Sequence, residues 1–340
     1  MNKVLLIYTG GTIGMKEDPA DQTLRPFDFG SLMEEVPELR KFALKIDSYT
    51  FDPLIDSSDI EPGMWQKLAG IIERHYEAYD GFVVLHGTDT MAYSASALSY
   101  MLQNLSKPVV FTGSQLPIGR LRTDGRENLV SAVEIAGSKL PDGSATVPEV
   151  CIYFNSLLLR GNRSTKVDAD GFDAFRSPNM PPLAEAGIDI RFNHDLIRRP
   201  SGGEFGIGTA LDTRVSILKV HPGITEQVVK DVLLGSATRA VILETFGCGN
   251  APSRDWFLDI IRQASDSGKI LLNVTQCLRG TVNMDLYATG RALSRAGVLS
   301  GYDITLEGAL GKLFFLMGKN NDNEYVKSYL ERNLRGEITK

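Results

Sequence analysis

Small polar side chains recur in this sequence beside short apolar runs and helical patterns. They lie in five segments, which are Thr9–Gly14, Asp56–Asp59, His86–Thr90, Gly113–Gln115 and the stretch from Asn155 to Lys166. A threonine hydroxyl is a weak nucleophile at neutral pH and needs a neighbouring base. A lysine can supply that base when burial lowers its pKa, while an adjacent aspartate favours the charged form. Such groups, with backbone N–H groups of glycine turns to hold an oxyanion, suit acyl transfer to water.

Each segment taken alone also has a structural explanation. A tight turn needs glycine whatever its function, Thr88 and Asp89 could cap a helix, and Lys166 could be a solvated surface residue. We expect His86 to be a hydrogen-bonded turn residue, because no other histidine stands at ligand spacing from it. The patterns GxSxG, HExxH, GxGxxG and the phosphate-binding P-loop are absent. The functional interpretation therefore rests on the combination of segments.

Parallel strands alternating with helices would position these segments. Continuous apolar runs, typical of strands covered on both faces, occur at Val4–Tyr8, Phe82–Leu85, Val109–Thr112, Val150–Phe154, Val215–Val220, Ala240–Leu243 and Ile270–Val274. Helical patterns predict helices at Pro62–Tyr79, Thr90–Leu105, Gly125–Gly137, Thr225–Leu234, Ser253–Ser267 and Glu324–Leu334, the first of them capped by Asp59. The alternation predicts an α/β fold with a doubly wound sheet. Ligands of such sheets bind outside the carboxyl ends of the strands, where several of the polar segments lie.

The composition is that of an ordinary globular protein of about two domains. The chain has 340 residues, 43% of them hydrophobic, and a formal net charge of −6. This acidic balance lacks the basic field of a nucleic-acid-binding protein, and no apolar stretch is long enough to span a membrane. Charge, proline and glycine cluster from Arg191 to Leu211. We therefore predict an N-terminal domain over residues 1–190, a linker over 191–211 and a C-terminal domain over 212–340.

The three cysteines, Cys151, Cys248 and Cys277, stand far apart and show no CxxC spacing. This excludes a disulfide framework and argues against a zinc cluster, so we expect no metal site and expect all three to be small apolar core residues. The N-terminal apolar run is too short for a signal peptide, which predicts a cytoplasmic protein.

Two segments resemble the signatures of the bacterial-type L-asparaginase family. They are Tyr8–Gly14 and Leu85–Met91, in the order in which the family carries them. Further similar segments extend the resemblance from Lys3 to about Leu334, and they are Asp56–Asp59, Thr112–Gln115, Arg160–Lys166, Gly247–Pro252 and Tyr287–Gly290. The sequence most resembles the cytoplasmic type I branch. The resemblance implies a two-domain asparaginase-like fold, with a larger N-terminal parallel-sheet domain and a smaller C-terminal α/β domain.

The resemblance also implies an activity, which is hydrolysis of L-asparagine to L-aspartate and ammonia without a cofactor. By position, Thr12 is the implied nucleophile and forms an acyl-enzyme. Thr88, Asp89 and Lys166 are the implied second hydroxyl and proton relay.

Substrate binding and assembly are implied in the same way. The implied ligands of the substrate's α-amino and α-carboxylate groups are Asp56, Ser57, Ser58, Thr88 and Asp89. The family usually assembles as a homotetramer built from a pair of dimers. L-asparagine is thus the expected partner, with no nucleic acid and no membrane.

The sequence departs from the family pattern in its activating tyrosine. Much of the family carries this tyrosine on the loop after the nucleophile, yet Met15–Pro26 contains none. Some type I relatives use a tyrosine from the neighbouring subunit, and Tyr287 stands in the matching segment, although packing at a dimer interface would explain it nearly as well. If Tyr287 acts in this way, a lone protomer should be poorly active.

A second departure concerns regulation. Thr165, Asn250, Thr275 and Cys277 match an allosteric asparagine site of some type I enzymes, but Glu244 stands where those enzymes carry an arginine. An arginine could hold the effector's carboxylate through two hydrogen bonds, whereas a glutamate would repel it. We therefore expect weak or absent activation by this effector.

Three alternative interpretations differ in class. The amidase component of an archaeal-type tRNA-dependent amidotransferase shares the fold, but it carries an extra N-terminal domain for which a turn beginning at Thr9 leaves no room. A non-catalytic amino-acid sensor would keep the pocket without turnover, and the intact set of Thr12, Thr88, Asp89 and Lys166 argues against it. A nucleotide-binding protein that uses the glycine turn would need a lysine–hydroxyl or acidic partner that is missing here.

Overall fold

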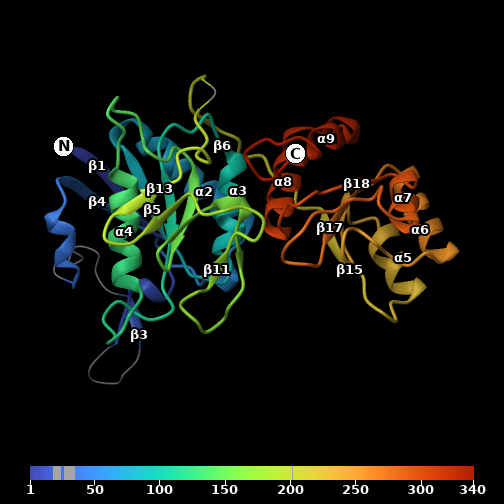
Figure 1. Cartoon of the computed structure of the whole chain (residues 1–340), viewed down its shortest axis with the longest axis horizontal. Helices are drawn as coiled ribbons and strands as arrows, with labels where there is room; N and C mark the ends of the chain where they lie inside the picture. The colour runs from blue at the N-terminus through green and yellow to red at the C-terminus, as the bar shows by residue number, and fades with distance from the viewer. Residues whose placement is uncertain (18–23, 27–34, 201) are drawn as a thin grey trace. The chain divides into compact units, whose positions relative to one another are not determined.

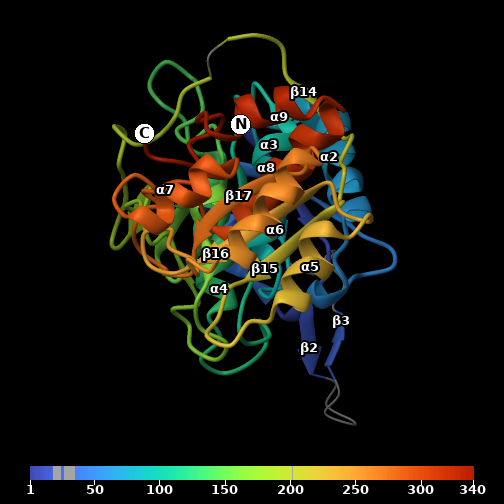
Figure 2. The same cartoon turned by 90° about the vertical axis from the view of Figure 1, so that its right-hand side faces the viewer.

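A computed structural model of the chain describes residues 1–17, 24–26, 35–200 and 202–340. These residues form two compact units, a first unit from Met1 to Ile207 and a second unit from Gly208 to Lys340. In each unit, helices pack against a sheet (Figures 1 and 2). The boundary falls inside the segment 191–211, parts of which are strands of the first unit.

The first unit is built on an eight-stranded sheet with the order β13-β12-β9-β8-β7-β5-β1-β4. Its parallel part consists of β4 (Leu44–Thr50), β1 (Asn2–Tyr8), β5 (Gly81–Leu85), β7 (Val109–Thr112) and β8 (Val150–Phe154). An antiparallel part follows, with β9 (Leu157–Arg160), β12 (Ala184–Ala186) and β13 (Ile190–Phe192). The α/β class is confirmed. The sequence does not predict β4. The residues of this edge strand are half-buried or exposed, so the strand does not need the continuous apolar run by which the other strands were predicted.

Helices flank this sheet on both sides: α4 (Gly125–Gly137) on one, and α2 (Pro62–His75) with α3 (Met91–Met101) on the other (Figure 1). The predicted apolar face of α2 is buried, as Trp65, Leu68, Ile71, Ile72 and Tyr76 show. The expectation that Asp59 caps α2 is wrong. Glu61 is the N-cap residue, and Asp59 instead ends a 3₁₀ turn, Ser57–Asp59, that Asp56 caps.

The second unit is a parallel sheet in the order β15-β16-β17-β18 with helices around it. Its strands are β15 (Val215–Lys219), β16 (Ala240–Thr245), β17 (Ile270–Thr275) and β18 (Val298–Ser300). Its helices are α5 (Glu226–Leu234), α6 (Asp255–Asp266), α7 (Ala288–Arg295), α8 (Leu306–Lys319) and α9 (Asn323–Leu330). The sequence does not predict α8, because that helix is buried on most of its circumference and lacks the polar stripe of a surface helix.

Short strand pairs complete the described chain. They are β2 (Met15–Glu17) with β3 (Leu24–Pro26), β6 (Leu102–Gln103) with β14 (Gly206–Ile207), and β10 (Thr165–Lys166) with β11 (Phe175–Arg176). Within the described residues, no helix has the length and apolar character needed to cross a membrane.

The cysteines differ from one another in burial. Cys151 is buried in β8, as expected for a core residue, and Cys248 is half-buried. The expectation is wrong for Cys277, which is exposed. This residue lies just beyond the end of β17, outside the buried strand.

Candidate active site

Two glycine turns at the carboxyl ends of β1 and β5 are in direct backbone contact. Gly10 and Gly11 follow β1 with φ angles of 140° and 92°, a region that favours glycine. A Cβ atom on Gly11 would lie 2.5 Å from the backbone nitrogen of Gly87, and one on Gly10 would lie 2.0 Å from the carbonyl oxygen of Ile55. These glycines therefore serve the close approach of three loops as well as the tight turn itself.

The loop before α2 contributes a carboxylate held by its own turn. Asp56 Oδ1 accepts hydrogen bonds from the backbone N–H and from the hydroxyl of Ser58, both at 2.8 Å. These bonds hold the pKa of the Asp56 carboxyl below its ordinary value, so the group is anionic at neutral pH. Ser57 is buried against Gly87, and its carbonyl oxygen accepts a hydrogen bond from the Thr90 hydroxyl at 2.6 Å.

The three loops enclose a cavity of about 310 Å³ at the carboxyl edge of the parallel strands. Its wall is formed by Gly10, Gly11, Thr12, Met15, Leu54, Ile55, Asp56, Ser57, Gly87, Thr88 and Asp89. The structure thus places Thr12, Asp56, Ser57, Thr88 and Asp89 around one space. Ser58 is exposed beside it and is joined to it through Asp56.

Lys166 reaches this wall from a segment distant in the sequence. Its Nζ atom donates hydrogen bonds to Thr88 Oγ1 at 2.9 Å and to Asp89 Oδ1 at 2.8 Å. The Lys166 side chain is 18% exposed, whereas that of Asp89 is 63% exposed. Lys166 is therefore no solvated surface residue. Thr88 and Asp89 do not cap α3 either, since Thr90 is its N-cap residue.

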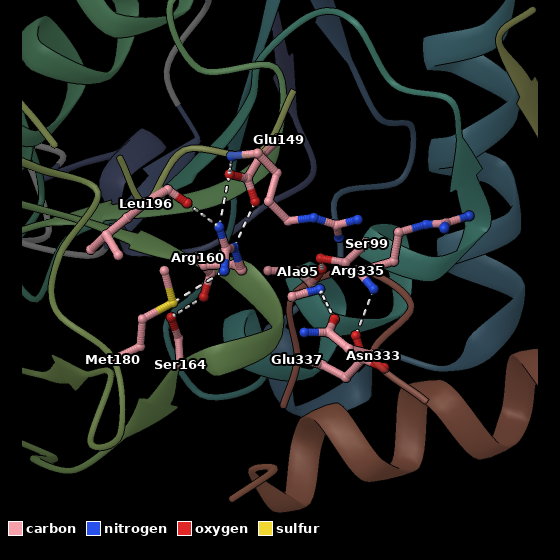
Figure 3. Close-up of polar contacts among 12 residues, drawn as sticks. Ala95, Ser99, Glu149, Arg160, Ser164, Met180, Leu196, Asn333, Arg335 and Glu337 are labelled. Atoms are coloured by element: carbon pink, nitrogen blue, oxygen red, sulfur yellow. Dashed lines mark hydrogen bonds and ion pairs between the residues drawn. The ribbon is translucent and has the colours of Figure 1, made fainter. Parts of the chain in front are cut away.

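A buried ion pair anchors the chain that leads to Lys166 (Figure 3). Arg160, the last residue of β9, donates from Nε to Glu149 Oε2 at 2.6 Å and from Nη2 to Glu149 Oε1 at 3.0 Å. Its Nη2 also donates to the carbonyl oxygen of Leu196 at 2.7 Å. The carbonyl oxygen of Arg160 accepts the Ser164 hydroxyl at 2.7 Å. The position of β10, and with it that of Lys166, is therefore set by buried polar contacts.

Gln115 touches this group of residues, and the sequence did not indicate a role for it. Its Oε1 accepts a hydrogen bond from the Thr88 hydroxyl at 3.4 Å, and its Nε2 donates to the carbonyl oxygens of Ala169 and Gly171 at 3.1 and 3.0 Å. The nitrogen must face those two carbonyls, so the oxygen faces Thr88. The one feature of the sequence that could have indicated a role for Gln115 is its position just after β7, at the carboxyl edge of the sheet where ligands bind.

Thr12 begins a short 3₁₀ helix, Thr12–Gly14, and lies in the cavity wall. Among the described residues, none forms a hydrogen bond with the Thr12 hydroxyl.

Tyr8 supports the glycine turn before Thr12. It donates its phenolic proton to the carbonyl oxygen of Gly11 at 3.2 Å, and burial raises the pKa of Tyr8 above the ordinary range. Tyr8 is thus a structural support. The expectation for the loop Met15–Pro26 falls partly on residues 18–23, which lie outside the described residues.

Comparison with known protein families identifies both parts of the chain. Residues 3–198 match the family profile described as Asparaginase, N-terminal. Residues 214–330 match the profile described as Glutaminase/Asparaginase C-terminal domain. The chain belongs to the asparaginase family.

Individual relatives match nearly the whole of this chain. The chain is 44% identical to L-asparaginase 1 of Escherichia coli strain K12, over 99% of this chain and 98% of that protein. Its structure matches that of L-asparaginase I from Vibrio cholerae with a TM-score of 0.90 and 43% identity, over 100% and 99% of the two chains. The resemblance to the type I branch and the two-domain asparaginase fold are therefore confirmed. The chain is also 42% identical to the 60 kDa lysophospholipase of Mus musculus, of which it covers 62%.

In this asparaginase-family chain, Tyr287 lies in the second unit. It is the N-cap residue of α7, and 53% of its surface is exposed. Within the described residues, no cluster of three or more histidine, cysteine or acidic side chains could hold a metal ion.

The residues matched to an allosteric site occupy both units. Thr165 lies in β10 of the first unit, directly before Lys166. In the second unit, the Thr275 hydroxyl donates to the carbonyl oxygen of Gly247 at 2.6 Å and accepts the backbone N–H of Cys277 at 3.0 Å.

Two further residues of this comparison also lie near or beyond the end of β16. They are Asn250, the remaining matched residue, and Glu244, which stands in place of the arginine. The side-chain oxygen of Asn250 accepts the hydroxyl of Thr289 at 2.6 Å. Glu244 is half-buried near the end of β16. The Thr275 hydroxyl and the Asn250 amide thus bond to groups of the second unit itself.

Proposed function

We propose that this protein hydrolyses L-asparagine to L-aspartate and ammonia through an acyl-enzyme on Thr12. The observation that carries the proposal is the position of Lys166 Nζ, within hydrogen-bond distance of both Thr88 Oγ1 and Asp89 Oδ1 in the wall that also contains Thr12. A hydroxyl, an amine and a carboxylate in contact provide a path for a proton. The family membership gives this chemistry its substrate, as the resemblance to type I asparaginases implies.

The reaction proceeds in two acyl transfers. Thr12 Oγ attacks the carboxamide carbon of the substrate, and ammonia leaves with the proton of the Thr12 hydroxyl, which gives an aspartyl ester. Water then attacks the ester and passes a proton through the Thr88 hydroxyl to Lys166. The bond between the Thr12 oxygen and the acyl carbon then breaks, and Lys166 returns the proton through the Thr88 hydroxyl to the Thr12 oxygen as aspartate leaves.

Substrate binding uses the anionic groups of the same wall. The carboxylates of Asp56 and Asp89 attract the substrate's α-ammonium group, while Ser57 and Ser58 hydroxyls and neighbouring backbone N–H groups hold its α-carboxylate. An ammonium group beside Asp89 competes with Lys166 for that carboxylate. Binding of the substrate therefore helps to release Lys166 for proton transfer.

Ammonia release from L-asparagine by the purified protein tests this proposal. Replacing Thr12 with alanine should lower kcat by about 10⁴-fold or more, because no other group supplies the nucleophile. Thr213→Ala, which removes an exposed hydroxyl in the second unit, is the matched control and should leave kcat unchanged. Equal rates for the wild type and Thr12→Ala would remove Thr12 from the mechanism. Steady-state kinetics with L-asparagine, L-glutamine and D-asparagine in the same assay establish the specificity.

We further propose that the active assembly is a homotetramer of paired dimers in which Tyr287 of one subunit completes the site of its neighbour. The exposure of Tyr287 in the single chain supports this, since an aromatic ring on the surface is available to a partner. Mixing and reassembling inactive Thr12→Ala and Tyr287→Phe subunits should restore about one quarter of the activity, because half of the randomly formed dimers contain one intact site. Failure of the mixture to regain activity would assign Tyr287 a packing role only.

A further inference from the structure

A chain of buried polar side chains runs from α2 through α3 to the second glycine turn. Trp65 Nε1 lies 2.9 Å from Ser94 Oγ, Ser94 Oγ lies 2.9 Å from His86 Nε2, and His86 Nδ1 lies 2.7 Å from the carbonyl oxygen of Gly87. All three side chains are buried, and none of them lines the cavity. The proposed mechanism assigns them no direct contact with substrate, so another reason is needed for this buried polar chain.

The chemistry of the groups determines the direction of every hydrogen bond in this chain. An indole N–H can only donate, so Ser94 Oγ accepts from Trp65. A carbonyl oxygen can only accept, so His86 Nδ1 carries a proton and donates it to Gly87. Burial lowers the pKa of His86 to about 4, so the ring is neutral at physiological pH and its Nε2 is an acceptor. The Ser94 hydroxyl proton then points to Nε2, and the polar atoms of the chain are all satisfied.

The bond to Gly87 determines the orientation of the peptide that follows it. The peptide between Gly87 and Thr88 is trans and planar, so its C=O and N–H groups point in opposite directions. The carbonyl is directed at His86, in the protein interior. The N–H of Thr88 therefore points away from His86, and both Gly87 and Thr88 line the cavity. No residue in the described part of the chain accepts this N–H group.

We propose that Trp65, Ser94 and His86 are positioning residues that aim the Thr88 backbone N–H at the oxyanion formed when Thr12 attacks the substrate. In that step the Thr12 oxygen–carbon bond forms, and the electron pair of the carbonyl π bond moves onto the carbonyl oxygen. A rigidly held N–H group stabilises this charge in the transition state more than in the bound substrate. The inference rests on the proposed function and extends it to residues outside the cavity.

Two substitutions test the chain at different points. Ser94→Ala removes the donor to His86 and should lower kcat about tenfold, with KM within about twofold of wild type, since a donor that is misaimed but present loses part of the 10²–10³-fold effect of such a group. Trp65→Phe keeps most of the ring volume and removes only the indole N–H, so its effect on kcat should have the same sign and be smaller. The matched control is Ser99→Ala on the same helix. That hydroxyl bonds to the carbonyl oxygen of Ala95 one turn earlier, so kcat should not change.

A double variant separates positioning from general loss of stability. Ser94→Ala removes the hydroxyl that accepts the buried Trp65 N–H, which lowers the thermal stability. Adding Trp65→Phe should raise the unfolding temperature again while kcat stays low. Recovery of kcat together with stability would overturn the proposal, and so would a Ser94→Ala variant with wild-type kcat.

A spectroscopic measurement reads the chain independently of turnover. With ¹⁵N-labelled histidine, His86 should appear as the neutral tautomer protonated at Nδ1, and a signal protonated at Nε2 would overturn the proposal.

The assay with wild type and Thr12→Ala identifies the cause of any failure. If the wild-type protein releases no ammonia from L-asparagine, both the proposed function and the positioning role of Trp65, Ser94 and His86 are refuted. An active wild type with an unaffected Ser94→Ala variant refutes the positioning role alone.

Discussion

Each unit of the molecule contains a lysine–carboxylate ion pair, and the two pairs differ in their surroundings. Lys166 Nζ lies 2.8 Å from Asp89, and Lys312 Nζ lies 2.6 Å from Glu337. The first pair borders the cavity, with the Thr88 hydroxyl as a further partner and an aspartate that is mostly exposed. The second pair is completely buried, with both side chains 0% exposed.

The backbone satisfies the second pair almost entirely. Lys312 Nζ donates to the carbonyl oxygens of Leu330 and Arg332 at 2.7 and 2.5 Å. The Glu337 carboxylate accepts the backbone N–H groups of Leu334 and Arg335. Figure 3 shows Glu337 beside Arg335. Such a pair ties the C-terminal segment to α8 and cannot exchange partners without unfolding that segment. The two ion-pair distances are similar, so the hydrogen-bond partners of each lysine distinguish Lys166, which is suited to proton transfer, from the structural Lys312.

The largest expected effect tests the pair at the cavity. Lys166→Met should lower kcat by about a thousandfold, because the proton relay through Thr88 loses its acceptor. The free energy of unfolding should change little, since a partly exposed ion pair contributes little to stability. Steady-state ammonia release and urea denaturation measure the two quantities. Lys230→Met is the control, because Lys230 pairs with Glu226 on the surface of α5 and should affect neither. An active Lys166→Met enzyme would contradict the role assigned to the first pair.

The buried pair should respond in the opposite way. Lys312→Met leaves the Glu337 carboxylate buried without its counter-ion, which should lower the free energy of unfolding by about 3–5 kcal/mol. The kcat of the remaining folded protein should be unchanged. The double variant Lys312→Met, Glu337→Gln removes the buried charge as well and should recover part of the loss in denaturation experiments. A loss of kcat without a loss of stability would reverse the comparison.

Acid should affect the two units in different pH ranges. Burial lowers the pKa of His86 in the first unit to about 4 from 6.5. The unfolded chain therefore binds more protons between these values, and the stability present above pH 6.5 declines by about 3 kcal/mol as the pH falls to 4. In the second unit, hydrogen bonds from Arg214 and Arg239 lower the pKa of Asp212 to about 2 from 3.8, so its contribution is lost only between those lower values.

Urea denaturation as a function of pH measures both effects. His86→Asn should flatten the pH dependence of the unfolding free energy between pH 6.5 and 4, relative to the wild type. Asp212→Asn should flatten it only below pH 3.8. Parallel curves for the wild type and His86→Asn would show that His86 is not held neutral in the folded protein.

The smallest expected effect concerns the strand ends of the second unit. Initial rates should depend hyperbolically on the concentration of L-asparagine, because Glu244 repels the carboxylate of an effector. Cys277→Ala should leave that curve unchanged. A sigmoidal curve that Thr165→Ala or Cys277→Ala makes hyperbolic would show that the residues matched to the allosteric site bind a ligand.

The sequence predicted the parts of the fold that have strong local signals. Continuous apolar runs marked β1, β5, β7 and β8 to within one or two residues, because strands buried on both faces need such runs. The edge strand β4 and the buried helix α8 lack a characteristic pattern and were missed. The short strand β10, which carries Lys166, consists of two residues, and its place depends on contacts remote in the sequence.

The candidate site divides in the same way. The resemblance to the family motifs indicated Thr12, Thr88, Asp89 and Lys166 and further similar segments along the chain. It indicated neither the contact of Gln115 with Thr88 nor the hydrogen-bonded chain that ends at Gly87. Both depend on side chains from elements far apart along the chain, and no spacing along the sequence reports such a contact.

By itself, the sequence determined the chemical groups available, the alternation of strands and helices, and the family. These follow from residue type and local periodicity, which the chain carries wherever it folds. Only the tertiary structure decided the contacts of each lysine, which are a hydroxyl at a cavity for Lys166 and backbone carbonyls for Lys312. The physical reason is that the state of a charged group depends on its burial and its hydrogen-bond partners, and packing assigns those from distant parts of the chain.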